Sequence, residues 1–151
     1  MPLTLNIVTM EREVYNADDV EIVVVPGSEG VMGILPRHEP ILSALKEGEI
    51  EIVRPGRRDI LAIGGGFVEV RGPQVLIMAD VAEQSDEIDL ARAERARAEA
   101  LEALAKAPAQ AERLDMIHAL RRAEARIKVA RRRRRGPVSY THLTLPTSDL
   151  V

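Results

Sequence analysis

The sequence predicts an α+β protein: an N-terminal antiparallel β-sandwich followed by a C-terminal two-helix hairpin. Residues 3–81 contain short runs rich in Val, Ile and Leu that alternate with turn residues, with no helical period between them. From Ser85 onward Ala, Glu, Arg and Leu dominate, and these residues favour helices. Strands followed by helices, rather than alternating with them, are typical of this fold class.

The strands are expected in runs separated by glycine and proline. Pro55-Gly56 and Gly72-Pro73 predict two hairpin turns. Residues 26–40 contain three glycines and three prolines, which predict a loop of defined shape at a sheet edge. The predicted strands are Leu3–Thr9, Asp19–Val25, Glu49–Arg54, Ile60–Ile63, Phe67–Val70 and Val75–Ala79.

Two helices are expected after the strands. The first covers Ser85–Ala105, the segment Lys106–Ala109 interrupts the pattern at Pro108, and the second runs to about Ala130. Apolar residues recur at helical spacing in both, and on the first helix much of that face is alanine, so its stripe is thin. The members of the two stripes are Leu90, Ala93, Ala100, Leu101 and Leu104 in the first helix, and Met116, Ile117, Leu120, Ala123, Ile127 and Ala130 in the second. Such a hairpin is suited to packing closely and separating again, although permanent packing on its own sandwich is the alternative.

Charge supports a boundary near Ala82. Residues 1–82 have 7 basic and 13 acidic side chains, whereas residues 83–151 have 14 and 11. We therefore expect a sandwich in residues 1–82 and a hairpin in residues 83–135. Residues 136–151 show no helical period, and we expect a disordered or non-native tail there.

Composition excludes several classes of function. The chain contains no cysteine, which rules out disulfides and thiolate chemistry. Its three histidines are scattered, and no nucleophile stands beside a base, so we expect no metal site and no catalytic residue. No apolar run is long enough to span a membrane, and the start lacks the pattern of a signal peptide, so the protein should stay in the compartment where it is made.

Two motifs resemble those that bind phosphate or nucleic acid, but other features of the sequence argue against such a ligand in each case. Residues 64–66 are glycines, but the spacing of a phosphate-binding loop is missing, and a bulge or close backbone approach explains them better. Residues 131–135 are arginines, which are typical of a solvated helix end or a polyanion contact. Because interleaved aromatic residues are absent, no nucleic-acid partner is expected. A free-standing module that binds an acidic protein or nucleic acid through this basic hairpin is the alternative function.

The order and spacing of many residues resemble the epsilon-subunit family of rotary ATP synthases over about residues 3–130. The resemblance rests on Gly30, Gly33-Ile34-Leu35-Pro36, His38, Pro40, Gly65-Gly66-Phe67, Glu69-Val70, Ala79-Asp80 and Ala82-Glu83. It implies a non-catalytic central-stalk subunit that couples proton flow to ATP synthesis and requires no cofactor. It also implies a peripheral location on the cytoplasmic face of the cell membrane, or on the thylakoid membrane.

The resemblance implies partners for each part. In that family the sandwich binds the gamma subunit and the c-ring, so Glu29, Val31 and His38 would face them; many relatives have an acidic residue where this chain has Val31. In bacterial relatives the hairpin folds down beside the sandwich or extends into the alpha/beta catalytic ring and inhibits ATP hydrolysis.

A regulatory ATP site is also implied. Some relatives bind ATP through an Ile/Leu-Asp-x-x-Arg-Ala motif, which this chain matches at Ile88, Asp89, Arg92 and Ala93. By the same comparison Glu83 would contact the nucleotide, and Arg122 and Arg126, one turn apart on the second helix, would face its phosphates. The alternative is that Asp89 caps a helix and Arg92 forms a surface ion pair, which stabilises a protein by only about 0–1 kcal/mol.

Overall fold

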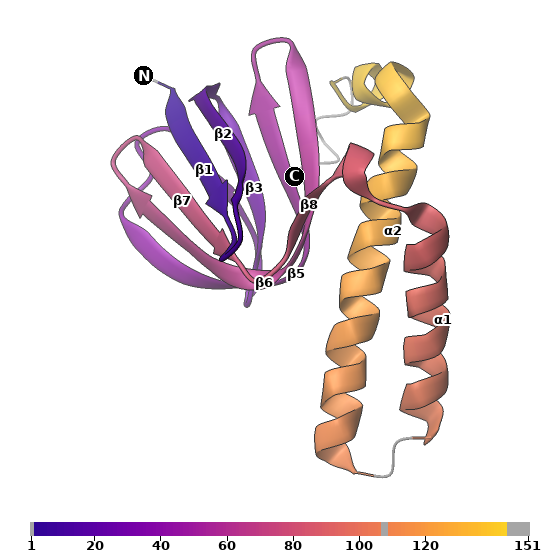
Figure 1. The fold of residues 1–151 in the computed structure, drawn as a ribbon. Coiled ribbons are helices and arrows are strands. Elements are labelled where there is room, and N and C mark those ends of the chain that lie inside the picture. Colours follow the sequence, from indigo (N-terminus) through magenta and orange to yellow (C-terminus); the bar gives the residue numbers. More distant parts are fainter. Residues whose placement is uncertain (1, 107–108, 145–151) are drawn as a thin grey trace.

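The computed structural model describes residues 2–106 and 109–144, with side chains described for residues 2–106 and 109–132. In these residues a strongly curved sheet is followed by two long helices that stand beside it (Figure 1). The strands are β1 (Leu3–Val8), β2 (Glu13–Val20), β3 (Ile22–Gly27), β4 (Gly30–Ile34), β5 (Ile41–Arg54), β6 (Arg57–Arg71), β7 (Gln74–Ala79) and β8 (Ala82–Gln84). They are followed by the 3₁₀ turn η1 (Ser85–Glu87) and the helices α1 (Leu90–Lys106) and α2 (Gln110–Thr144).

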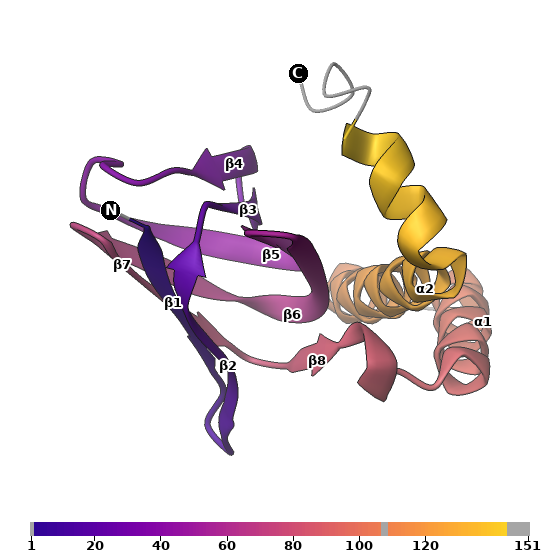
Figure 2. The same ribbon diagram turned by 90° about the horizontal axis from the view of Figure 1, so that it is seen from above.

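The sheet folds over itself into a sandwich because β5 and β6 are long. Its strand order is β2-β1-β7-β6-β5-β3-β4, and β8 pairs with β6 beside the part that β7 leaves free. Seen from above, β3, β4 and β5 form one side, β1, β2 and β7 the other, and the helices stand against the margin near β5, β6 and β8 (Figure 2). The predicted sandwich followed by a helical hairpin is confirmed.

One strand pair departs from the antiparallel prediction. β1 and β7 pair in parallel, from Thr4 opposite Gln74 to Val8 opposite Met78. These two strands lie far apart in the sequence and are not joined by a tight turn, so parallel pairing is open to them. Two other departures are extra strands: most of β2 and all of β4 form where the sequence predicts connecting segments.

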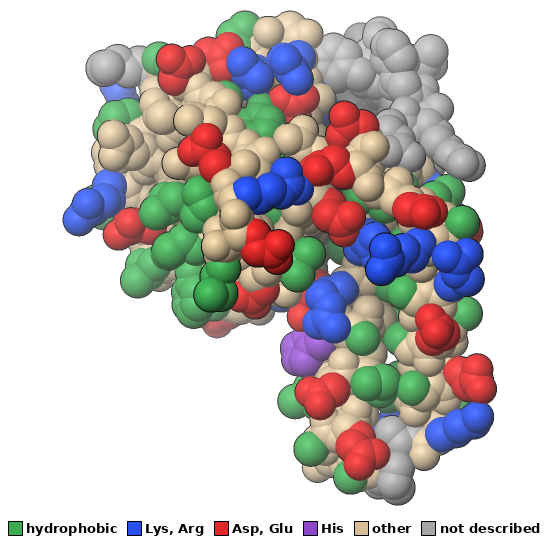
Figure 3. Space-filling view, viewed as in Figure 1, with side chains coloured by type: hydrophobic (Ala, Val, Ile, Leu, Met, Phe, Trp, Pro, Cys, Tyr) green, Lys and Arg blue, Asp and Glu red, His purple; other side chains and the backbone are tan. Residues whose placement is uncertain are grey.

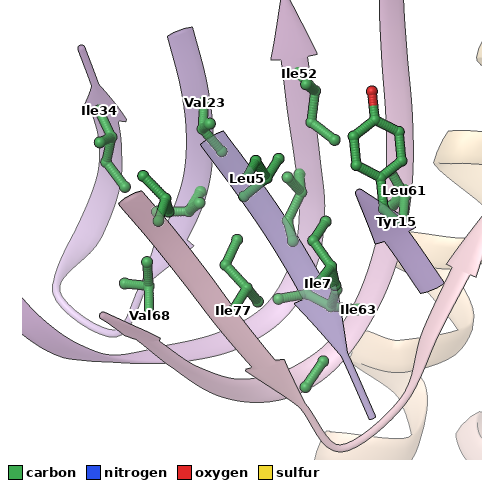
Figure 4. Close-up of a cluster of buried hydrophobic side chains, with 14 of the residues drawn as sticks. Leu5, Ile7, Tyr15, Val23, Ile34, Ile52, Leu61, Ile63, Val68 and Ile77 are labelled. Carbon is green, nitrogen blue, oxygen red and sulfur yellow. The ribbon is translucent and has the colours of Figure 1, made fainter. Parts of the chain in front are cut away.

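The core lies between the two sides of the folded sheet. Buried and less buried residues alternate along β1, as expected when one face of a strand meets the core. Figure 4 shows aliphatic side chains from strands of both sides pointing toward one another. Among the largest that are fully buried are Leu3, Leu5, Ile7, Ile34, Ile50, Ile52, Leu61 and Ile77. Among the described residues, every buried member of this core lies within residues 3–82, so the helices contribute none of them.

The three consecutive glycines lie inside one continuous strand. β6 runs through residues 64–66 and joins the two strands that the sequence predicts separately. Leu61 and Ile63 face the core before the glycines, and Val68 and Val70 face it after them, so the alternation shifts by one residue. The expected close approach is confirmed, because a Cβ placed on Gly66 would lie 2.1 Å from the carbonyl oxygen of Met78.

The helices pair with each other, and α2 is the one that meets the sheet (Figures 1 and 2). Ala93 and Ala100 are buried on α1, whereas Leu101, predicted for the same stripe, is exposed. On α2 the buried residues include Ala123, Ile127 and Ala130, as the stripe predicts. Within the described residues, neither helix is both long and apolar enough to cross a membrane.

α2 is longer than the sequence predicts. The backbone of residues 136–144 is helical, where the sequence predicts a tail without regular structure. An arginine-rich segment favours helix, and a proline inside an established helix bends it rather than always ending it. Figure 2 shows the yellow end of α2 leaving the axis of the rest. Residues 145–151 lie outside the described part, and whether this segment is native stays a prediction.

We predict that Gly66→Ala destabilises the sandwich by about 3 kcal/mol or more, because the new Cβ would meet backbone atoms that cannot move aside. Gly72→Ala is the matched control. Gly72 also has a positive φ, of 56°, but open space surrounds it, so the cost should be about 1 kcal/mol. Urea unfolding followed by circular dichroism measures both, and equal losses would contradict this account.

Candidate functional site

The start of the hairpin is held by a cap and an apolar anchor. The backbone N–H of Arg92 donates to Asp89 Oδ1 at 3.1 Å, which makes Asp89 the N-cap of α1. Ile88, just before it, is buried in a small cluster with Ala62, Ala125, Val129 and Ala130. The cluster joins the outer face of β6 to α2, so the position of the hairpin beside the sheet is defined at this point.

Small side chains bring α2 close to the sheet. Ala62 and the partly buried Ile60 lie on the face of β6 that points away from the sandwich core. They meet Ala125, Val129 and Ala130, whose short side chains allow a close approach of helix and strand. This second apolar cluster is much smaller than the core of the sandwich. The hairpin is therefore joined to the sheet by far less apolar contact than joins the two sides of the sandwich.

A pocket of about 230 Å³ lies between the sandwich and the hairpin. Its walls come from β6, the β7–β8 connection, β8 and both helices, and they include Gly64, Val81, Glu83, Ala96, Arg122 and Arg126. Figure 3 shows basic and acidic side chains close together where the sandwich meets the helices. Small-molecule sites usually have about 300–1,000 Å³, so a nucleotide would need more room than this arrangement leaves.

Two arginines give the pocket its positive charge. Arg126 pairs with Glu83, with Nε 2.6 Å from Oε1, and both side chains are about three-quarters buried. Arg122 has no carboxylate within ion-pair distance among the described side chains. Its stem lies over Gly64, where an added Cβ would come within 3.0 Å of Arg122 Cδ. Arg122 is thus a cation at the pocket that is available to an anion.

The structure brings together part of the predicted nucleotide site. Glu83, Arg122 and Arg126 line one pocket, while Ile88 is buried in the neighbouring apolar cluster. Asp89 and Arg92 are exposed and do not line the pocket. Ala93 is buried on α1. The capping role that was the alternative for Asp89 is present, and nucleotide contact by any of these residues stays a prediction.

The residues predicted to face other subunits lie on and beside β4, which Figure 2 places at the margin of the sandwich, apart from the helices. Glu29 is exposed in the turn before β4, and the Val31 side chain on that strand is 73% exposed. His38 is partly buried, and its Nδ1 lies 2.7 Å from the carbonyl oxygen of Glu39. These positions are accessible, as contact with a partner requires.

Sequence reasoning missed an apolar surface on neighbouring strands. Phe67 on β6 stands directly opposite Met78 on β7, and both are exposed. Leu42 is exposed on β5, the strand on the other side of β6. Figure 3 shows apolar side chains gathered over the lower part of the sandwich. Alternation along β6 was the available signal, because Val68 and Val70 point inward and Phe67 must then point outward.

The shifted acid–base groups belong to the sandwich and not to the pocket. Burial, and then a hydrogen bond to Asp59, raise the pKa of Tyr15 to about 12. The hydrogen bond from Arg54 lowers the pKa of Asp19. These groups tie β2 to β5 and β6 at one end of the sheet. No group of three or more potential metal ligands occurs in the described part of the chain.

Comparisons with known proteins decide the family. A family model described as the β-sandwich domain of the ATP synthase delta/epsilon chain matches residues 2–85. An ATP synthase epsilon chain of Herpetosiphon aurantiacus is 46% identical over 134 residues, which is 89% of this chain and 98% of that protein. The chain belongs to the ATP synthase delta/epsilon family. An epsilon chain of Chloroflexus aggregans is 51% identical over 100 residues, covering 66% of this chain and 71% of that one.

Solved structures agree with this family. A chain in the cryo-EM structure of the Euglena gracilis mitochondrial ATP synthase superimposes with a TM-score of 0.74 at 27% identity, covering 85% of this chain and 81% of that chain. The role is therefore that of an epsilon subunit, a non-catalytic rotor component of the ATP synthase central stalk. The alternative of a free-standing binding module is not supported.

We predict that Glu83→Gln lowers the stability of the docked hairpin by about 1 kcal/mol or more, because Arg126 would lose its charged partner in a partly buried position. Glu124→Gln is the matched control. Glu124 pairs with Arg97 at 3.5 Å, both side chains are about half exposed, and the loss should stay within about 0.5 kcal/mol. Thermal unfolding of the helices, followed at 222 nm, compares them; similar losses would show that the Glu83 pair contributes no more than a surface pair.

Proposed function

We propose that this epsilon subunit anchors to the rotor through its sandwich and restrains ATP hydrolysis through its hairpin. The observation that supports this most is the unequal packing: a large core holds the sandwich together, whereas a small cluster centred on Ala62 and Ile88 joins the hairpin to it. A hairpin attached in this way can leave the sheet without exposing the core. In the extended state it would reach the alpha/beta catalytic ring.

The sandwich is proposed to bind the gamma subunit and the c-ring. The turn at Glu29, the exposed Val31 and the segment at His38 would form part of this contact. The exposed apolar side chains of Leu42, Phe67 and Met78 support a second contact area, because exposed apolar clusters commonly mark protein interfaces. The relative from Euglena gracilis is part of an assembly that includes a c-ring. The complex would place this subunit on the cytoplasmic face of the membrane.

The hairpin pocket is proposed to bind regulatory ATP in the docked state. Arg122, without a carboxylate partner among the described residues, would meet a phosphate first. Arg126 would exchange Glu83 for a second phosphate oxygen, and the pocket would widen as the arginines turn outward. ATP bound there would favour the docked hairpin, because it binds only when both helices line the pocket.

We expect ATP hydrolysis by an epsilon-depleted catalytic complex to be several-fold lower with the full chain than with a truncation that ends at Gln84. The truncation keeps β8, whose Gln84 Nε2 donates to the carbonyl oxygen of Val14 at 2.9 Å. Both should bind gamma equally, which serves as the folding control. Equal hydrolysis rates with both bound chains would remove the restraining role, and failure of both to bind would remove the proposed anchoring.

Nucleotide binding should fail in Arg122→Ala and persist in Arg121→Ala. Arg121 is the adjacent exposed arginine and does not line the pocket. Asp89→Ser separates capping from nucleotide contact. Serine is also a good N-cap, so the variant keeps the helix cap but removes the carboxylate that would contact the nucleotide. Calorimetric titration with ATP measures the nucleotide affinity of the isolated full chain and of each variant. Equal affinity in the parent and Arg122→Ala would show that the pocket is not the site.

A further inference from the structure

Three glutamates of β5 form an acidic row under the hairpin. Glu47, Glu49 and Glu51 are two residues apart, so their side chains project from the same face of the strand. They are only 8%, 20% and 10% exposed. Carboxylates buried to this degree are costly unless charged or hydrogen-bonding partners face them. This face of β5 therefore requires a basic surface on top of it.

α2 supplies that surface from residues on one side of the helix. His118 Nδ1 donates to Glu47 Oε2 at 2.8 Å. Arg132 divides its guanidinium between two carboxylates, with Nη1 2.7 Å from Glu49 Oε1 and Nη2 3.0 Å from Glu51 Oε2. Lys128 Nζ adds a longer contact of 3.5 Å to Glu49. His118 and Arg132 are about four helical turns apart, so they lie on the same side of α2.

Arg132 is the central member of this set. Its side chain is 19% exposed, and it is the described residue of α2 that contacts two members of the acidic row. Glu51 has a further, weaker partner within the sheet, Arg58 at 3.7 Å. Glu49 instead depends on Lys128 and Arg132, both from α2. When α2 leaves, Glu49 loses both of these partners.

We propose that the acidic row and its α2 partners form a charge latch that sets how strongly the hairpin docks on the sandwich. The latch consists of Glu47, Glu49 and Glu51 on β5 with His118, Lys128 and Arg132 on α2. It is separate from the pocket, since none of its residues lines the pocket. The docking equilibrium is a property of the isolated chain, and only its effect on hydrolysis rests on the proposed function.

The physical character of the latch suits reversible docking. The charged groups of the latch regain water when they separate. Undocking also leaves no large apolar surface uncovered beyond the small cluster near Ala62. The cost of desolvating the ions offsets much of their attraction, which keeps the net docking energy small. Removing one charge alone is different, because its partners would then be buried without compensation. Salt weakens the more exposed contacts by screening them.

Spin-label distances on the isolated full chain test the latch. The chain has no cysteine, so Gln74→Cys on β7 and Asp115→Cys on α2, both exposed, give two unique labelling sites. We expect one docked distance in low salt and a growing second population in 1 M salt. Arg132→Glu should raise the ratio of undocked to docked chains about tenfold or more at every salt concentration.

Arg131→Glu is the matched control, because it makes the same charge change one residue earlier. Arg131 pairs with Glu94 of α1 and not with the sandwich, and both side chains are at least half exposed. Its distances should match those of the parent. Combining Arg132→Glu with Glu49→Arg should restore much of the docked population, while helix content by circular dichroism verifies that α2 still forms.

Two results would overturn the proposal. One is a docked fraction that depends on neither salt nor Arg132→Glu. The other is an equal effect of Arg131→Glu and Arg132→Glu, which would indicate a response to net charge and not to the acidic row. If the latch responds as expected while hydrolysis by the reconstituted complex does not change with it, the latch stands and the restraining role of the hairpin fails.

Discussion

α2 packs on the outer face of β5 and β6, and the position of the hairpin, the pocket and the charged contacts of the hairpin all depend on this contact. The contact contains small apolar residues, such as Ala62 and Ala125, and a set of ion pairs in which Arg132 is the central member. The helix must approach closely for the pairs to form, and the short side chains allow it. The pocket lies between the two parts, where Arg122 and Arg126 of α2 and Glu83 of β8 line it.

The sandwich and the hairpin are held together by different kinds of interaction. The interior of the sandwich is almost wholly aliphatic, with Leu5, Ile7 and Ile77 completely buried, so it forms a rigid anchor. The contact with the hairpin is small in apolar area and rich in ions. Under the proposed function the sandwich stays attached while the hairpin moves, and this division suits it, because apolar cores resist separation whereas ions regain water when they separate.

Periodicity and composition in the sequence predicted the main parts of the fold, and the resemblance to the epsilon family pointed to three of the residues that line the pocket. Glu83, Arg122 and Arg126 do line one pocket, although they come from a strand and a helix far apart in the chain. Asp89 instead caps α1. The acidic row escaped notice because alternation along β5 does not say which side of the strand another element will cover. The parallel pairing of β1 and β7 was not predicted either, because no turn connects these two strands in the sequence.

The sequence by itself determined the two-part architecture, the family and the lack of cysteine chemistry, because local periodicity, residue order and composition are properties of the chain alone. Only the tertiary structure decided which side chains meet across the hairpin contact. Spacing along the sequence does not distinguish Arg122 from Arg126, yet Arg126 pairs with Glu83, whereas Arg122 has no carboxylate at ion-pair distance among the described side chains. That difference arises from where α2 crosses the sheet, and residue spacing along the sequence does not specify this position.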